Sequence, residues 1–177
     1  MHMKIEYTPQ FTRGILFLCT GNVFRSRTAA ALARKSGIDA FSRGFDTQRL
    51  KDEGILEDMN YMANGDAANI IMEPDAYAYL KQHDVPDYLI ETAPKNVLPK
   101  DFSNASIVVC MNYREHYPMM EKFRMVHNIN PKNVMYWDIP DIEKKEGWKG
   151  FGDNLDYMDK NDILLTIKDK VQSLFRS

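Results

Sequence analysis

The sequence predicts an α/β fold: a four-stranded parallel sheet, helices on both of its faces, and a functional loop after the first strand. Short apolar runs alternate with helix-forming segments along the chain. This alternation is typical of βαβ crossovers, which cover both faces of a parallel sheet. The 177 residues, 44% of them hydrophobic, are enough for the core of a single domain over 1–177.

The first half of the chain supplies two strands and one helix. Residues 14–18 form a continuous apolar run that suits a strand buried on both faces, and 26–35 are rich in helix formers. A second short strand is predicted at 39–42. Residues 1–12 are interpreted as a lead-in, and in 46–70 glycines interrupt a partial helical spacing.

The second half continues the alternation. A helix begins with Pro74 in its first turn and ends before Pro86, and Asn112 is a candidate cap for a helix that Pro118 should bend. This capped helix is predicted at 113–125 and follows a strand at 106–111. A strand at 133–137 and a final helix at 159–175 with one apolar face complete the predicted elements.

Composition limits the functional classes. The chain has 23 basic and 25 acidic residues, a net charge of −2, which argues against a nucleic-acid partner. No apolar run approaches the ~18 residues that suggest a membrane span. Of its two cysteines, Cys19 and Cys110, the second lies in an apolar run and is predicted to be a buried strand residue. Without a disulfide framework, a reducing cytoplasm is the expected compartment.

The stretch Cys19-Thr-Gly-Asn-Val-Phe-Arg-Ser26 lies between the first strand and the first helix. A loop at a helix N-terminus presents unpaired backbone N–H groups and the positive end of the helix dipole. Gly21 and Asn22 both tolerate a positive φ, so successive N–H groups can turn inward and form an anion nest. We therefore expect the loop residues Thr20, Gly21, Asn22, Val23 and Phe24 to bind an oxyanion such as phosphate.

Two side chains give this loop its chemistry. Arg25 offers a planar fork suited to two phosphate oxygens. Cys19, facing N–H dipoles and a guanidinium, should be a thiolate at neutral pH, and the Ser26 hydroxyl can donate a hydrogen bond to its sulfur. The alternative is a buried strand cysteine without function, the usual state of a free cysteine. The four histidines have no ligand spacing, so we predict no metal site.

Cys19, five residues, then Arg25-Ser26, with Gly21-Asn22 between them, resembles the phosphate loop of the low-molecular-weight protein tyrosine phosphatases. The resemblance covers about residues 14–175 except 46–70, a region that the family crosses in fewer residues. We interpret 46–70 as an insertion near the mouth of the site, where it could be a lid, a partner surface or a simple surface excursion. It implies hydrolysis of a phosphorylated protein or small aryl phosphate through a phosphocysteine on Cys19, without a cofactor. It also implies that Ser42, in Ser42-Arg43-Gly44, supports the loop by hydrogen bonding, although a simple Ser-Gly turn is an alternative interpretation.

The resemblance also suggests a general acid. The family carries it after the fourth strand, in a loop ending Asp-Pro, and here Trp137-Asp-Ile-Pro-Asp141-Ile142 follows that strand. Asp141 matches the family position, and one carboxyl group can protonate the leaving group and then activate water. Ile142 replaces the family's proline, so Asp138 stays a rival, and both could be solvated loop carboxylates.

Other positions depart from the family pattern. Phe24 replaces a second loop cysteine, so the family's protective disulfide is absent. The aromatic residues that flank a phosphotyrosine ring are missing after Asp141; Trp148, Phe151 or Phe24 could take their place. The family's supporting histidine before the third strand would fall near Thr92, so we expect the hydrogen-bond network there to be altered.

Three alternatives to a tyrosine phosphatase remain. A related arsenate reductase would need further cysteines, and only Cys110 is available. Protein-arginine phosphatases of this fold carry Thr where this chain has Val23. The third alternative is a non-catalytic phosphoprotein-binding module that uses 46–70 as its partner surface. The presence of Cys19, Arg25 and Asp141 together favours an enzyme.

Overall fold

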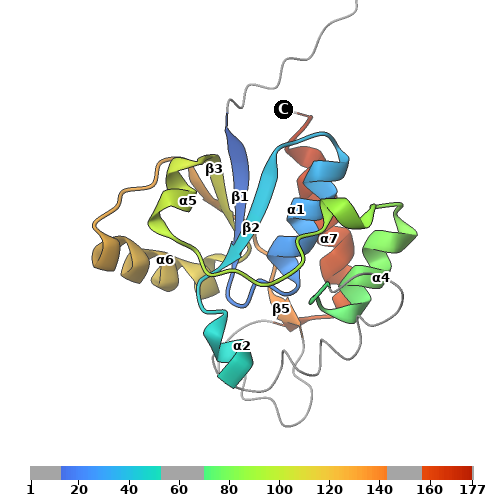
Figure 1. The fold of residues 1–177 in the computed structure, drawn as a ribbon, viewed down its shortest axis with the longest axis horizontal. Coiled ribbons are helices and arrows are strands. Elements are labelled where there is room, and N and C mark those ends of the chain that lie inside the picture. Colours follow the sequence, from blue (N-terminus) through green and yellow to red (C-terminus); the bar gives the residue numbers. More distant parts are fainter. Residues whose placement is uncertain (1–12, 53–69, 143–156, 177) are drawn as a thin grey trace, which may run out of the picture.

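The computed structural model describes residues 13–52, 70–142 and 157–176 (Figure 1). It contains a four-stranded sheet, all parallel, in the order β2-β1-β3-β4, which confirms the predicted fold class. The strands are β1 Gly14–Cys19, β2 Ala40–Gly44, β3 Ala105–Cys110 and β4 Val134–Tyr136. Because β1 lies between two neighbours and is covered on both faces, all six of its residues are buried.

Helices cover both faces of the sheet (Figure 1). One face carries α1, α4 and α7, and the other carries α5 and α6. A short α2 and a 3-10 turn, η1, lie in the connections. The bounds are α1 Arg25–Lys35, α2 Gln48–Asp52, α4 Pro74–Gln82, η1 Asp87–Leu89, α5 Pro99–Ser103, α6 Tyr113–His127 and α7 Lys160–Ser173.

Two apolar cores follow from the alternation of side chains along β1. Ile15 and Phe17 pack into the core under α1, α4 and α7, whereas Leu16 and Leu18 pack into the core under α5 and α6. Four buried alanines of α1, at positions 29, 30, 31 and 33, allow this helix to lie close to the sheet and to α7. This close packing fixes the N-terminus of α1, where the cysteine loop ends.

The predicted elements agree with the structure to within a few residues. Asn112 caps α6, as expected, because its side chain accepts a hydrogen bond from the Glu115 N–H at 3.1 Å. Pro118 lies inside α6 without ending it. Four short elements were not predicted: α5, η1, and the small parallel pair of β5 (Asp141–Ile142) with β6 (Tyr157–Met158). Most of the predicted insertion, 53–69, lies outside the described residues, as do Trp148 and Phe151.

The carboxyl ends of the strands define the functional edge of the sheet, at the bottom of Figure 1. The loop after β1, the turn after β2 and the segments after β3 and β4 all meet there, as expected for a parallel sheet. Backbone hydrogen bonds continue past β4, from Trp137 N to Cys110 O at 2.8 Å and from Ile139 N to Met111 O at 2.9 Å. None of the helices in the described ranges has the length and apolar character of a membrane span.

Candidate active site

The loop between β1 and α1 is folded so that its carbonyls face outward. Thr20 O accepts from Asp46 N at 2.9 Å, Val23 O from Glu73 N at 3.0 Å, and Phe24 O from Thr28 N at 3.0 Å. In a planar trans peptide the following N–H points the opposite way, so these N–H groups turn toward the loop interior. Asn22 takes the predicted left-handed conformation, with φ of 55°. The backbone thus has the form of an anion nest.

The Cys19 sulfur lies at the base of this nest. Its Sγ accepts a hydrogen bond from the Asn22 N–H at 3.2 Å and is 3.0 Å from Ser26 Oγ. The residue is only 3% exposed. These two contacts hold the sulfur in a fixed position at the base of the nest.

A chain of polar side chains determines which atom donates to the sulfur. Glu91 accepts from the Ser42 hydroxyl and from Ser42 N. Ser42 Oγ therefore accepts from Asn22 Nδ2 at 2.9 Å, and the same amide donates to Ser26 Oγ at 3.0 Å. Asn22 Oδ1 accepts from Lys95 N at 2.9 Å, which fixes the amide orientation. The Ser26 hydroxyl hydrogen is consequently left to donate to Cys19.

Arg25, the first residue of α1, is buried next to the loop and carries an ion pair. Nη1 lies 2.7 Å from Glu115 Oε2 and Nη2 lies 2.8 Å from Glu115 Oε1, a bidentate arrangement. Nη1 also donates to Ile139 O at 3.1 Å, and Nη2 lies 3.5 Å from Asp141 Oδ1. Although burial opposes the charged guanidinium, Asp141 and Glu115 raise the pKa of Arg25 well above its usual value.

Glu115 lies in the first turn of α6 and is surrounded by donors. Besides Arg25, its Oε1 accepts from the Thr20 hydroxyl and lies 3.2 Å from His116 Nε2. Burial opposes the carboxylate, but Arg25 and His116 together hold the pKa of Glu115 far below its usual value. The carboxylate is therefore charged at any pH at which the fold is expected to work.

His116 is fully buried and its tautomer is fixed. Nδ1 accepts a hydrogen bond from the Asn112 backbone N–H at 2.9 Å, so it carries no proton. In the neutral ring Nε2 then carries the hydrogen and faces Glu115 Oε1. Burial lowers the pKa of His116 below its usual 6.5. The Asn112 N–H also disfavours a second proton, because it already occupies the lone pair of Nδ1 that this proton would need.

The two candidate acids lie in different places. Asp141 begins β5, and its carboxylate, 21% exposed, lies 3.5 Å from Arg25 Nη2. Asp138 is exposed to solvent. The hydrogen bonds of Trp137 and Ile139 to the β3 end direct this segment toward the loop, so Asp141 and not Asp138 reaches Arg25.

Structural comparison found solved structures with this fold. The chain is similar to Wzb from Vibrio vulnificus in complex with benzylphosphonate (TM-score 0.59, 16% identity, 92% of this chain and 96% of that one). It is similar to the tyrosine phosphatase AmsI from Erwinia amylovora (TM-score 0.58, 16% identity, 93% and 91%). The third is SP-PTP, a low-molecular-weight protein tyrosine phosphatase from Streptococcus pyogenes (TM-score 0.56, 15% identity, 93% and 91%).

The chain has the fold of the low-molecular-weight protein tyrosine phosphatases. Solved structures of an arginine phosphatase from Drosophila and a thioredoxin-dependent arsenate reductase from Corynebacterium glutamicum also share it. No protein-family model and no curated protein sequence matches the chain. At identities of 14–18%, these structural similarities establish the fold only. The activity therefore has to be argued from the residues.

The predicted site residues that the structure describes gather around the phosphate loop, with one correction. Cys19, Thr20, Asn22, Ser26 and Ser42 are joined by the contacts above. Phe24, however, is 4% exposed and its ring packs in the core under α1, so it cannot form an aromatic wall beside the site. Because Phe24 is the last residue before α1, its ring is directed inward, and only the backbone of Phe24 belongs to the loop.

Three residues that support the loop were not predicted from the sequence. Glu91 contacts Ser42 through its carboxylate and lies one residue before Thr92, near which the resemblance predicted a supporting residue. Glu115 and His116 were not considered, although an acid in the first turn after a capping Asn112 was visible in the sequence. What the sequence lacked was the pairing of β3 with β1, in which Leu18 faces Cys110 and the residues beyond each strand become neighbours.

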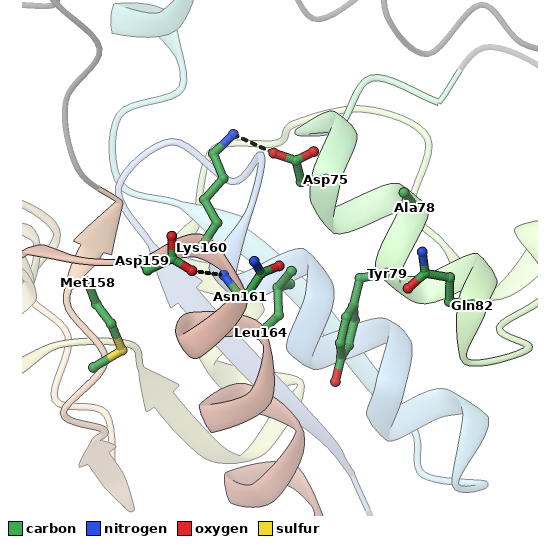
Figure 2. Close-up of a pocket in the computed structure, with 9 residues that line it drawn as sticks. All are labelled: Asp75, Ala78, Tyr79, Gln82, Met158, Asp159, Lys160, Asn161 and Leu164. Atoms are coloured by element: carbon green, nitrogen blue, oxygen red, sulfur yellow. Dashed lines mark hydrogen bonds and ion pairs between the residues drawn. The ribbon is translucent and has the colours of Figure 1, made fainter.

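A pocket of the described surface lies elsewhere, between α4 and the N-terminus of α7 (Figure 2). Its rim carries the Lys160–Asp75 ion pair at 2.7 Å, and Tyr79 and Leu164 project into the space between the helices. Lys160 is also held by Glu73 at 2.5 Å, so its charge is already neutralised. None of the residues predicted for the phosphate loop lines this pocket.

Proposed function

We propose that the chain is a metal-independent phosphomonoester hydrolase that works through a phosphocysteine on Cys19. The observation that supports this most is the sulfur itself. It sits at the base of an inward-facing N–H nest, receives two hydrogen bonds, and has the buried Arg25 beside it. Such a site neutralises the equatorial oxygens of a transferring phosphoryl group without a metal.

The proposed reaction has two balanced steps. The Cys19 thiolate forms an S–P bond while the P–O bond to the leaving group breaks, and Asp141 gives its proton to the leaving oxygen. Water then attacks the phosphocysteine, passing a proton to Asp141, and the S–P bond breaks to release phosphate and restore the thiolate. Asp141 is the proposed acid and base because its carboxylate lies 3.5 Å from Arg25, whereas Asp138 is exposed.

We propose aryl phosphates, and phosphotyrosine in a protein above all, as the substrate class. Cys19 is 3% exposed, so a phosphate on a long aryl stem reaches it better than one on a short serine or threonine side chain. No cofactor is needed, and the two free cysteines suit a reducing compartment such as the cytoplasm.

An arsenate reductase that passes oxidation to a second cysteine is a weaker candidate. Cys110 is 0% exposed, and it packs in the core under α5 and α6, whereas Cys19 belongs to the opposite core. Burial also raises the pKa of the Cys110 thiol far above its usual value, which leaves it protonated and unreactive.

The deciding experiment is hydrolysis of a chromogenic aryl phosphate in the presence of a chelator. Cys19→Ser should abolish turnover, because a serine hydroxyl is a far weaker nucleophile than a cysteine sulfur. Cys110→Ser is the matched control and should keep the activity. Turnover that survives Cys19→Ser would disprove the covalent route. A panel of phosphotyrosine, phosphoserine and phosphoarginine peptides with arsenate then identifies the substrate class.

A further inference from the structure

One edge of the Arg25 guanidinium is already occupied in this structure. Its two terminal nitrogens form the bidentate pair with Glu115, and both side chains are nearly inaccessible, at 3% and 2% exposed. A guanidinium has five N–H donors in a fixed plane. A ligand of the loop must therefore use the donors that Glu115 and the backbone leave.

Counting these donors identifies the remaining edge. Nη1 gives its two hydrogens to Glu115 and to Ile139 O, and Nη2 gives one to Glu115. Within the described part of the chain, Nε has no hydrogen-bond acceptor, and Nη2 keeps a second hydrogen on the same side as Nε, with Asp141 Oδ1 3.5 Å from this nitrogen. These two form a side-on fork, the geometry that matches two oxygens of a phosphate.

Glu115 is itself held firmly enough to act as a template. The first turn of α6 carries it, and the Asn112 cap fixes that turn through the Glu115 N–H. The Thr20 hydroxyl and His116 Nε2 lie against its Oε1, and Asn112 N fixes the His116 ring from the other side. The carboxylate therefore has few alternative positions, and neither has the guanidinium that it binds.

We propose that Glu115 is a positioning residue: by binding the end-on edge of Arg25, it presents the side-on fork, Nε and Nη2, to the oxyanion in the loop. This inference rests on the proposed function for its catalytic consequence, but the anion site can be tested without turnover. The stabilisation that the oriented Arg25 donors provide should be greatest in the transition state, because its three equatorial oxygens need donors that are already in place.

A competing role for Glu115 predicts the opposite change in anion affinity when Glu115 is removed. A carboxylate beside an anion site repels the anion, so a Glu115 that acted only through its charge would weaken phosphate binding in the wild type. Removing it would then tighten the binding of every anion to a similar degree. Orthovanadate and inorganic phosphate separate these roles, because vanadate adopts the trigonal-bipyramidal geometry of the transition state and phosphate does not.

The experiment compares Glu115→Gln and Glu115→Ala with Glu121→Ala. Glu121 lies on the same helix in a surface ion pair with Arg124, 2.8 Å apart, and makes the matched control. For both Glu115 variants we expect kcat to fall by about 10-fold or more, and the ratio of vanadate to phosphate affinity to fall by a similar factor. Glu121→Ala should change neither quantity. Equal changes in both affinities would overturn the proposal.

A double-mutant cycle with Arg25→Ala completes the test. If Glu115 acts through Arg25, adding Glu115→Ala to Arg25→Ala should not weaken the binding of inorganic phosphate any further, and loss of the stranded carboxylate can only strengthen it. A further weakening would show an independent structural role and contradict the inference. Phosphate binding also separates the two proposals: a wild type that binds phosphate in the loop but hydrolyses nothing disproves the proposed function and leaves this cycle to decide the role of Glu115.

Discussion

The phosphate loop is supported from two sides, and the two supports differ in kind. On the β2 side, neutral groups of Asn22, Ser42 and Ser26 lead from Glu91 to the Cys19 sulfur. On the α6 side, a buried ion pair leads from Glu115 to the Arg25 guanidinium. The first side fixes the direction of hydrogen bonds, and the second fixes the orientation of a charge.

This difference determines how each side should respond to substitution. Hydrogen bonds between neutral groups contribute about 1 kcal/mol each, so losing one weakens the site without unfolding the chain. A buried ion pair that loses one partner leaves an uncompensated charge, which costs several kcal/mol. Substitutions on the α6 side should therefore affect folding and activity together, and those on the β2 side mainly activity.

The largest effect is expected for Arg25→Ala. It leaves the Glu115 carboxylate buried without its partner, so the free energy of unfolding should fall by about 3–5 kcal/mol and turnover should be lost. Adding Glu115→Gln removes the stranded charge and should recover much of the stability but no activity. Urea denaturation and the aryl phosphatase assay measure the two quantities. If Glu115→Gln fails to restore stability, the pair does not support the fold.

Asp141→Asn should come next. We expect it to slow hydrolysis of phosphotyrosine by roughly 10²-fold or more, and of an activated phenyl phosphate much less, because an activated phenol leaves without a proton. Asp138→Asn is the control, since Asp138 is exposed and should hardly change either rate. The reverse order of the two variants would place the acid at Asp138 and would disagree with the 3.5 Å contact of Asp141 with Arg25.

A smaller effect is expected on the β2 side. Glu91→Gln introduces a donor that can reverse the Ser42 hydroxyl, so the chain of hydrogen bonds no longer ends on the sulfur. We expect alkylation of Cys19 by iodoacetamide and kcat/KM to fall by about 10-fold, the equivalent of ~1.4 kcal/mol. Arg43→Gln removes the 3.1 Å Arg43–Glu91 ion pair, while the 3.6 Å Arg34–Glu91 pair and the Ser42–Glu91 hydrogen bonds stay in place, so it controls for the loss of one ion pair at Glu91. An unchanged alkylation rate would show that Glu91 does not direct the network.

The sequence predicted the sheet, its order of elements and the position of the loop after β1 because each depends on short-range patterns. The apolar run before Cys19, the tolerance of Asn22 for positive φ and the helix after Arg25 all lie within one stretch. The supports of the loop depend instead on pairings between distant segments. Glu115 lies 90 positions from Arg25, and only the β1–β3 pairing brings them together.

Phe24 differs from the prediction because the direction of its side chain decides whether it can reach a substrate. Phe24 is inside the loop in sequence, yet its ring turns into the core under α1. Glu91, by contrast, was missed by one position, because counting back from a later segment cannot fix the register of an irregular connection. Local pattern therefore identified the residues of the loop, and three-dimensional contacts identified the residues that hold them.

The smallest predicted effect concerns the dependence of stability on pH. Burial lowers the pKa of His116 below 6.5, so in the acidic range the unfolded chain binds a proton there that the folded chain does not. Stability should therefore be full above about pH 6.5 and decrease as the pH falls below it, by at most ~1.4 kcal/mol per pH unit for one proton. The pKa of Glu115 is also lowered, but its contribution is lost only as the pH falls through the ordinary carboxyl range.

The interval from pH 5 to 7 thus isolates the histidine. His116→Gln, whose amide can still donate to Glu115, should flatten the slope in this interval, whereas His127→Gln, at the exposed end of the same helix, should leave its contribution in place. Urea denaturation at several pH values measures the slope, and nitrogen NMR of the ring should show the neutral tautomer with hydrogen on Nε2 at pH 7. A protonated His116 at that pH would mean that the ion pair on the α6 side carries a net positive charge, and the comparison of the two supports would have to be redrawn.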